Sequence, residues 1–515
     1  MKIRVTTLRR LRRVVQYLTL ALFFYLVLWT RHDAAPLLPA DTFFRLDPLA
    51  AIASMLAGRQ FLPALLWAIG TIVLTLALGR VWCGWLCPMG TVLDIAASRA
   101  AAGDRPAVSP RWRTVKYVLL GVILVLALLG NQTLMILDPI TLITRTTATA
   151  ILPALDAFFT AIVTTLYPIR FLQGPLGWLD SALRGPILPA APRYYTLGLL
   201  IAVLFAGILA LNRLASRFWC RYLCPLGGLL GLLSRVALLR RFVTPACISC
   251  KRCSRLCPTG TIDASAGFAS DPAECTVCLD CADICPTAAI TFPVQPRPPA
   301  PAPTYAPGRR QWLGALGTAV AAAVVLRIAP LGRRISAFLI RPPGGRENDL
   351  PSKCIRCGEC LKVCPTAGLQ PALDQDGPAS LWTPVLVPRI GYCDYSCNAC
   401  GRICPSGAIP ALDLDVKRTV IIGQAHINRD RCIPWSDNRS CTVCEEMCPV
   451  PDKAIKLEDV DVIGPDGQPV RLRRPHVERQ RCIGCGICEY QCPVAGEAAI
   501  RVYAPTDLSA IGGSQ

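Results

Sequence analysis

The residues whose type and spacing could do chemistry in this sequence are its 28 cysteines. Two consecutive groups have the spacing C-x2-C-x2-C-x3-C-P, ending at Pro258 and Pro286. In bacterial ferredoxins with this spacing, three thiolates bind one 4Fe–4S cluster and the fourth binds the neighbouring cluster. The spacing therefore predicts one cluster on Cys247, Cys250, Cys253 and Cys285, and a second on Cys275, Cys278, Cys281 and Cys257.

Four more proline-terminated groups follow in the C-terminal part. The first and last keep the strict spacing, the second widens its first gap by one residue, and the third has a longer first gap. An insertion between two ligands can loop outward without moving them, so the irregular groups also count as cluster ligands. The groups are Cys354, Cys357, Cys360 and Cys364; Cys393, Cys397, Cys400 and Cys404; Cys432, Cys441, Cys444 and Cys448; and Cys482, Cys485, Cys488 and Cys492. With the first two groups they predict six 4Fe–4S clusters.

The remaining four cysteines lie in an internal repeat. The copies read GRVWCGWLCPMGTVLD and SRFWCRYLCPLGGLLG, and contain Cys83, Cys87, Cys220 and Cys224. Soft thiolates favour iron–sulfur centres over hard cations, so a shared seventh iron–sulfur site is one interpretation. A redox thiol pair and inert buried cysteines are the alternatives. Asp47 and Asp138 precede proline upstream of the copies; they suit helix starts, and a role in quinone or proton chemistry stays open.

Other cysteine chemistries fit less well. Structural zinc sites separate two C-x2-C pairs by a longer loop, and disulfide scaffolds are short chains with denser cysteine. His32, His426 and His476 are isolated and have no expected ligand role. The chain has no haem-attachment motif, dinucleotide fingerprint or phosphate-binding loop, so flavin, nicotinamide and nucleotide chemistry lack support.

The elements that must position these cysteines include membrane helices. The mean hydropathy is +0.42 and the net charge +20. Apolar runs at 14–30, 61–79, 117–137 and 194–212 have about the length of a transmembrane helix, which is roughly 17 to 25 residues. Lys and Arg cluster at 1–13, 80–116 and 213–241, so these segments are expected in the cytoplasm and no nucleic-acid partner is expected. The run from Ala150 to Tyr167 is interpreted as an external interfacial or re-entrant helix.

Composition divides the rest of the chain. Residues 1–241 form the expected four-helix membrane unit, and 242–292 a two-cluster ferredoxin module. Residues 293–308 are a proline-rich linker. Arg309 and Arg310 begin an apolar stretch, 309–330, which is either a twin-arginine signal or a fifth span; a soluble or interfacial helix is the third interpretation. The last part, 331–515, is a four-cluster ferredoxin domain, outside the cytoplasm if 309–330 crosses the membrane.

Residues 1–292 resemble NapH, the membrane ferredoxin-type subunit of periplasmic nitrate reductase systems. Residues from about 309 onward, with WTPVLVPRIGYCDYSCNACGRICP and RCIPWSDNRSCTVCEEMCP, resemble the exported ferredoxin-type subunits NapG and MauM. The resemblance implies a fusion of the two kinds of subunit in one polyferredoxin of the quinol dehydrogenase family. By resemblance to four-cluster ferredoxin subunits, nested pairing is expected: Cys354, Cys357 and Cys360 with Cys492; Cys393, Cys397 and Cys400 with Cys448; Cys432, Cys441 and Cys444 with Cys404; and Cys482, Cys485 and Cys488 with Cys364.

The expected fold class is an α-helical membrane bundle with α+β modules of the bacterial ferredoxin type, one with two clusters and one with four. The expected function is membrane-bound iron–sulfur electron transfer from quinol, or from a cytoplasmic donor, to a periplasmic redox partner. The alternative is an assembly ferredoxin that supplies electrons for the maturation of a metalloenzyme. The chain is then either a component of a quinol dehydrogenase or an electron carrier without its own catalytic site. Spacing alone indicates only that electrons can be carried.

Overall fold

The computed structural model describes residues 2–29, 38–97, 109–184, 188–189, 193–294, 309–328, 338–347, 349–373, 377–463 and 469–505. It divides into two compact units, each made of three stretches of chain. The first contains Met1–Leu28, Pro36–Thr147 and Leu199–Val325, and the second contains Trp29–Ala35, Ala148–Gly198 and Leu326–Gln515. Most of the proline-rich linker lies outside the described residues.

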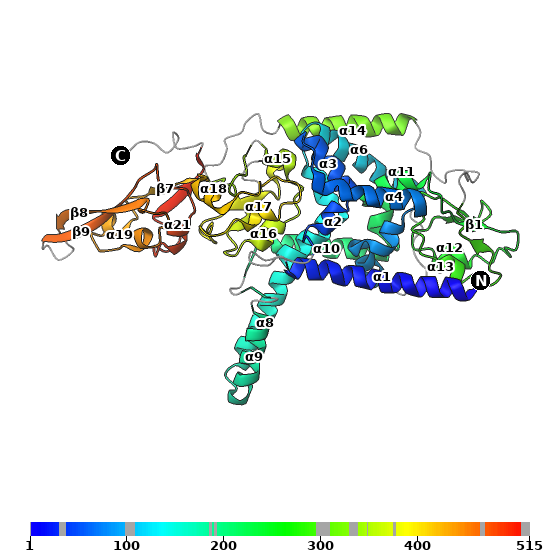
Figure 1. Cartoon of the computed structure of the whole chain (residues 1–515), viewed down its shortest axis with the longest axis horizontal. Coiled ribbons are helices and arrows are strands. Elements are labelled where there is room, and N and C mark those ends of the chain that lie inside the picture. The colour runs from blue at the N-terminus through cyan, green and yellow to red at the C-terminus, as the bar shows by residue number, and fades with distance from the viewer. Residues whose placement is uncertain are drawn as a thin grey trace. The chain divides into compact units, whose positions relative to one another are not determined.

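The first unit is mainly helical (Figure 1). Its helices are α1 (Lys2–Trp29), α2 (Thr42–Arg45), α3 (Pro48–Gly58), α4 (Ala68–Leu78), α5 (Pro88–Ala96), α6 (Thr114–Leu128), α7 (Pro139–Thr146), α10 (Gly198–Ala210) and α11 (Pro225–Ser234). Helices α3, α4, α6 and α11 pack together. Their sequences are rich in Leu and Ala, which favour the helix, and together with Ile and Val these supply apolar surface on nearly every side.

Two helices among the described residues are long and apolar enough to cross a membrane, Val5–Trp29 and Pro139–Leu166. The first contains most of the expected span at 14–30. The other expected spans form shorter helices: Pro63–Leu78 and Gly198–Arg213, and α6 of 15 residues. Glycines with a positive φ of 75° follow two of these helices: Gly79 at the end of the run 61–79, and Gly130 inside the run 117–137. These findings suggest association with a membrane.

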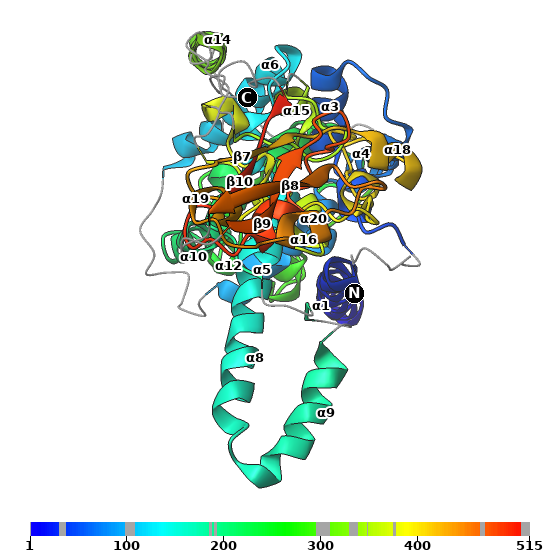
Figure 2. The same ribbon diagram turned by 90° about the vertical axis from the view of Figure 1, so that its left-hand side faces the viewer.

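The run from Ala150 to Tyr167, expected as an external interfacial or re-entrant helix, is part of the longer helical stretch Pro139–Leu166. A π-helical turn, Thr147–Ile151, joins α7 to α8 (Leu152–Leu166), so that Pro153 lies in the first turn of α8, where proline is tolerated. Helix α9 (Gln173–Leu183) then returns beside α8, and Figure 2 shows the two as a helical hairpin. Large apolar side chains on this hairpin are exposed, among them Phe158, Phe171 and Trp178.

Residues 242–294 form a small α+β module within the first unit. Strand β1 (Phe242–Val243) pairs antiparallel with β4 (Ile290–Thr291), and β2 (Ile262–Asp263) with β3 (Ala269–Ser270). Two short helices, α12 (Arg252–Leu256) and α13 (Asp280–Asp283), pack against each other. The small core consists of cysteines together with Ile262, Phe268 and Ile290. The segment 309–328 forms helix α14 (Arg309–Ile328).

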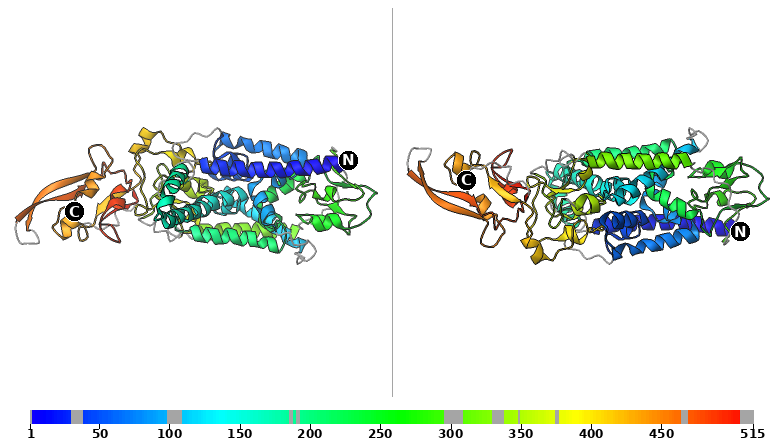
Figure 3. Two further views of the ribbon diagram at one scale, coloured as in Figure 1. Left: turned by 90° about the horizontal axis from the view of Figure 1, so that it is seen from below. Right: turned by 90° about the horizontal axis from the view of Figure 1, so that it is seen from above.

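The C-terminal part of the second unit is a larger α+β domain. Its helices are α15 (Leu350–Lys353), α16 (Glu359–Val363), α17 (Ala399–Arg402), α18 (Leu414–Thr419), α19 (Ile433–Ser436), α20 (Val443–Glu446) and α21 (Ile487–Gln491). Its antiparallel pairs are β5 (Leu369–Pro371) with β6 (Pro384–Leu386), β7 (Gln424–Ile427) with β10 (Ile500–Tyr503), and β8 (Ile455–Ile463) with β9 (Pro469–Val477). The last pair is the long ribbon in Figure 3. Both ferredoxin-type regions are thus short hairpins and helices around cysteines.

Candidate iron–sulfur sites

The four groups with strict spacing share one backbone conformation. In each, the residues just before and just after the second cysteine have positive φ: Ser249 and Lys251, Val277 and Leu279, Arg356 and Gly358, and Gly484 and Gly486. Non-glycine residues seldom adopt a positive φ, so its repetition in all four groups indicates that these loops require this conformation. The two irregular groups use another turn, since Asn398 and Thr442 have φ of −130° and −117°. The widened gaps therefore replace the left-handed turn.

The two consecutive groups of the first unit exchange their fourth cysteines, as the spacing predicts. Cys247, Cys250, Cys253 and Cys285 line one pocket, here called site A. Site B consists of Cys275, Cys278, Cys281 and Cys257. Burial raises the pKa of the Cys278 thiol, and the nearby charges of Asp280 and Cys257 raise it further. Each site therefore takes three cysteines from one group and its fourth from the other.

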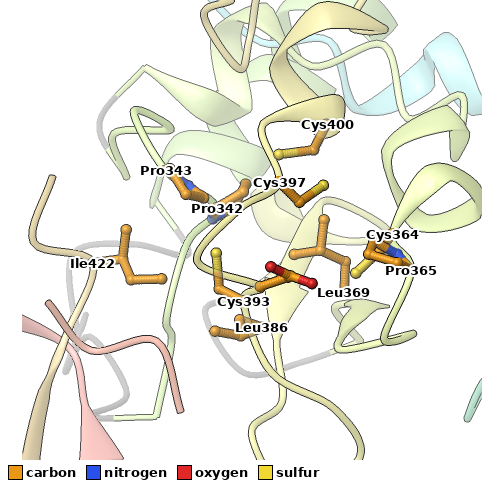
Figure 4. A pocket seen from close by; sticks show the side chains of 11 residues that line it. Pro342, Pro343, Cys364, Pro365, Leu369, Leu386, Cys393, Cys397, Cys400 and Ile422 are labelled. Atoms are coloured by element: carbon orange, nitrogen blue, oxygen red, sulfur yellow. The ribbon is translucent and has the colours of Figure 1, made fainter. Parts of the chain in front are cut away.

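The C-terminal domain shows the same exchange between consecutive groups, so the nested pairing is wrong. Cys393, Cys397 and Cys400 face Cys364 around one pocket, called site D (Figure 4). Cys432, Cys441 and Cys444 face Cys492 around another, called site E. Cys404 lies close to Cys354, Cys357 and Cys360 and completes site C: burial raises the pKa of these three thiols, and the charge of Cys404 raises it further. Cys448 lies in the same way beside Cys482, Cys485 and Cys488 and completes site F.

The exchange follows the packing of helices inside each pair of groups. Helices α16 and α17 pack against each other in the first pair, and α20 and α21 in the second. Each pair of groups therefore builds its own two-site module, as in residues 242–294, and a nested exchange would have to pull the paired helices apart.

The sites fit cubane clusters. The pockets at sites A, D and E are open to solvent and contain similar empty space, about 360, 390 and 370 Å³. All 28 cysteines are free of disulfides. Among the described residues, no three Cys, His, Asp or Glu side chains lie close enough together to hold a single metal ion. Four thiolates spread around a common space suit a cluster whose irons each take one sulfur.

Hydrogen bonds to the sulfur atoms recur across the sites. Backbone N–H groups donate to Sγ of Cys285 from Ala289 (3.3 Å), and to Sγ of Cys448 from Ala454 (3.3 Å). After four of the C-P pairs a hydroxyl lies near the cysteine sulfur, for example Thr259 Oγ1 at 3.5 Å from Cys257 Sγ. Such bonds stabilise negative charge on the sulfurs and so tune cluster potentials.

Contacts join the four C-terminal sites in an order that differs from the sequence. Sites C and D are neighbours, since Cys360 of site C and Cys400 of site D pack against the same apolar cluster. Sites D and F meet where the N–H of Cys393 donates to the carbonyl of Cys485 over 2.8 Å. Sites F and E are neighbours through Cys488 and Cys444. The spatial order is C, D, F, E.

The repeat cysteines also come together. Cys83 and Cys220 lie within π-helical turns, Trp82–Leu86 and Trp219–Leu223, and Cys87 and Cys224 end these turns. All four are buried. Burial raises the pKa of the Cys224 thiol, and the charges of Cys220, Cys83 and Cys87 raise it further. The four form one compact set, called site M, and the N–H of Gly227 donates to Cys224 Sγ over 3.2 Å.

Site M contacts the loop of site B. The indole N–H of Trp85 donates to the carbonyl of Val277, between Cys275 and Cys278, over 3.0 Å. A Cβ on Gly84 would lie only 2.2 Å from the carbonyl oxygen of Thr276, so this contact needs glycine. Helix α1 holds the other side of site B: Arg9 forms ion pairs of 2.6 Å with Asp280 and Asp283.

Asp47 and Asp138 are helix caps, as their sequence context suggests. Asp47 Oδ1 accepts N–H bonds from Leu49 (2.8 Å) and Ala50 (3.2 Å), and Asp138 Oδ2 accepts the corresponding bonds at α7. Both side chains are fully buried, and the second carboxyl oxygen of each, Asp47 Oδ2 and Asp138 Oδ1, has no hydrogen-bond partner among the described residues.

Comparison with known proteins gives the same chemistry. The family model of a 4Fe-4S binding domain matches residues 60–103 and 197–244, which contain the two repeat copies. A 4Fe-4S dicluster domain matches 268–365, across the linker, although the structure pairs each of its two motifs with a different neighbour. No solved structure matches the chain.

Several curated proteins are similar to this chain. The methylamine utilization ferredoxin-type protein MauM of Paracoccus denitrificans is 38% identical over 206 residues, 38% of this chain and 83% of that protein. The ferredoxin-type protein NapG of Escherichia coli is 34% identical over 202 residues, 38% of this chain and 85% of that protein. The putative electron transport protein YccM of Escherichia coli is 29% identical over 203 residues, 38% of this chain and 46% of that protein.

The four-cysteine sites on ferredoxin-type hairpins define an iron–sulfur electron carrier. The chain belongs to the family of ferredoxin-type proteins that includes MauM and NapG.

Sequence reasoning did not find the charged residues around site M. Arg80 and Arg217 each stand three positions before the first cysteine of a repeat copy, and both are 1% exposed. Glu274, which pairs with Arg80, immediately precedes Cys275. The pattern R-x2-C, which both repeat copies share, was the sequence signal that could have identified the two arginines.

Proposed function

We propose that the chain is a membrane-bound conduit in which seven 4Fe–4S clusters, one at each of sites M and A to F, carry electrons between a quinol and a periplasmic redox partner. The observation that carries the proposal is the direct contact of site M with the loop of site B. It supports transfer from a centre beside the membrane helices into a two-cluster module. The cysteines named above are the proposed ligands.

The proposal includes a fusion of a NapH-like membrane unit with a NapG- or MauM-like domain. A 4Fe-4S model that matches both repeat copies supports the first part, and the MauM and NapG relatives support the second. The exposed apolar side chains of the α8–α9 hairpin suit contact with lipid. We propose α1 as the first helix that crosses the membrane.

The proposed topology keeps residues 213–310 in the cytoplasm and 331–515 outside. One contact within the second unit supports it. Arg193 donates to the carbonyl of Lys362 over 2.6 Å, and the Tyr195 hydroxyl to that of Leu361 over 3.0 Å. The segment just before the apolar run 194–212, expected outside, therefore binds the C-terminal domain. Reporter fusions after Phe292 and after Gln515 should indicate opposite sides; equal signals would refute this topology.

Redox-titrated EPR with iron analysis tests the conduit. Anaerobically prepared protein should contain about 28 Fe per chain, at four Fe per cluster. A soluble quinol analogue should reduce the clusters in the parent. It should fail to do so in a Cys87→Ser/Cys224→Ser variant that dithionite still reduces. A double variant that retains all iron and is still reduced by quinol would overturn the role of site M.

A further inference from the structure

Two buried arginines cross between the repeat copies at site M. Arg217 belongs to the second copy, yet its Nη1 donates to the carbonyl of Cys83 in the first over 2.9 Å. A Cβ on Gly90, also in the first copy, would lie 3.8 Å from Arg217 Nη2. Arg80 of the first copy reaches the second in the same way, since a Cβ on Gly227 would lie 2.9 Å from its Nη2. The same nitrogen is 3.9 Å from Cys83 Sγ.

The partners of the two arginines differ. Arg217 Nε and Nη2 each lie 2.6 Å from an oxygen of Asp94, at the end of the first copy. The position of the second copy that corresponds to Asp94 is Gly231, and a Cβ there would lie 2.9 Å from the carbonyl oxygen of Ala273. The ferredoxin module occupies that space and supplies the missing carboxylate: Glu274 lies 3.2 Å from Arg80.

The network around Arg80 has excess positive charge. Lys116 Nζ lies 2.6 and 2.7 Å from the two oxygens of Glu274, so two cations share one carboxylate. The exposed fractions of Lys116, Arg80 and Glu274 are 0, 1 and 2%. Because a buried charge is costly unless it is compensated, this trio favours a further buried anion. Site M, with four thiolates beside Arg80, provides that anion when it holds a cluster.

We propose that Arg80 and Arg217 are positioning residues that compensate the negative charge of the cluster at site M and raise its reduction potential. The inference rests on the proposed cluster at this site. A cluster with four thiolate ligands is anionic and gains one more negative charge on reduction. Guanidinium groups fixed beside it, away from water, stabilise the reduced form more than the oxidised form. Gly227 allows the close approach of Arg80 that this requires.

The EPR signal lost in Cys87→Ser/Cys224→Ser identifies the cluster at site M. Replacement of Arg80 or Arg217 by Gln should shift the midpoint potential of that signal to a lower value, and the iron content should stay at the parent level. Arg80→Lys and Arg217→Lys keep the charge and should return the potential toward that of the parent. Arg45→Gln is the matched control: it removes a guanidinium paired with Asp41 and should leave the signal unchanged.

An unchanged potential in Gln variants that retain the cluster would overturn the inference, as would Lys variants that behave like Gln variants. If Gln variants lose the cluster, the iron content falls by about four per chain, and retention of iron in the Lys variants then supports the charge role. Loss in both would overturn it. If the double cysteine variant loses no iron, the proposed cluster itself fails, an outcome distinct from an unchanged potential.

Discussion

Single hydroxyl groups should set small differences between the clusters. Thr259 Oγ1 lies 3.5 Å from Cys257 Sγ, a ligand position of site B, and the Thr259 side chain is buried. Thr259→Val keeps the shape and removes the hydrogen bond. We expect a lower midpoint potential for site B, because the reduced cluster loses stabilisation of its extra charge.

Redox-titrated EPR measures this shift. Thr419→Val is the control, since the Thr419 hydroxyl donates only to the nearby Val416 carbonyl on an exposed helix. A site B potential equal to that of the parent would show that the Thr259 hydroxyl does not bond the sulfur.

The buried caps give a stability prediction. Asp47→Ala removes the acceptor for two N–H groups at the start of α3 and should destabilise the fold by about 1 kcal/mol, whereas Asp47→Asn can still cap. We expect a lower melting temperature for the alanine variant in detergent solution and recovery in the asparagine variant. Equal loss in both would mean that the charge, rather than the cap, is what Asp47 contributes.

Residue types and spacing were enough to find every cysteine of the sites and the caps at Asp47 and Asp138. They were not enough for Arg80 and Arg217, because the role of an arginine depends on what lies at the end of its side chain. The carboxylate paired with Arg80 is 194 positions away in the chain.

At the scale of elements, the close contact between the π-helical turn of site M and the loop of site B should tolerate no side chain at position 84. A Cβ there would lie 2.2 Å from the backbone oxygen of Thr276, and a backbone atom cannot rotate aside. Gly84→Ala should therefore push the 242–294 module away from the helices. We expect faster hydrogen exchange in the 273–279 loop and slower electron transfer between sites M and B.

Gly70→Ala is the matched control, because a Cβ at position 70 meets nothing within 4 Å and alanine favours the helix. If both variants exchanged hydrogen at the parent rate, the contact would not hold the module in place.

Apolar runs predicted where helices form but overestimated their length. A run such as 61–79 contains Pro63 and ends at Gly79, and the structure uses both as boundaries of a shorter helical stretch. The hydropathy of a run does not include the backbone conformation at its ends. Composition could not predict the α8–α9 hairpin either. Pro153 normally marks the interruption of a helix, but here a π-helical turn precedes it and the helix continues.

At the scale of the whole molecule, the exchange of fourth cysteines between consecutive groups is open to direct test. Cys432→Ala and Cys492→Ala should alter the same EPR signal, since both residues line site E. The nested arrangement would instead make Cys492→Ala alter the signal that Cys354→Ala alters. Comparison of the three variants distinguishes the two arrangements.

The ferredoxin spacing could predict the exchange at sites A and B but not its repetition in the C-terminal domain. Spacing defines which three cysteines lie together, and leaves the source of the fourth to helix packing. The contacts of α16 with α17 and of α20 with α21 decide it.

The spatial order C, D, F, E has a consequence for the rate and the fragility of electron flow. Among the described residues the contacts join the four proposed centres end to end, as in a series circuit, so the slowest single hop would limit the current through all of them. The bond from Cys393 to Cys485 joins the two halves of this circuit, beside the bonds from Arg389 to the carbonyls of Glu489 and Cys492. Oxidative loss of any one cluster would interrupt the current completely, whereas the same loss in a branched array would only reduce it.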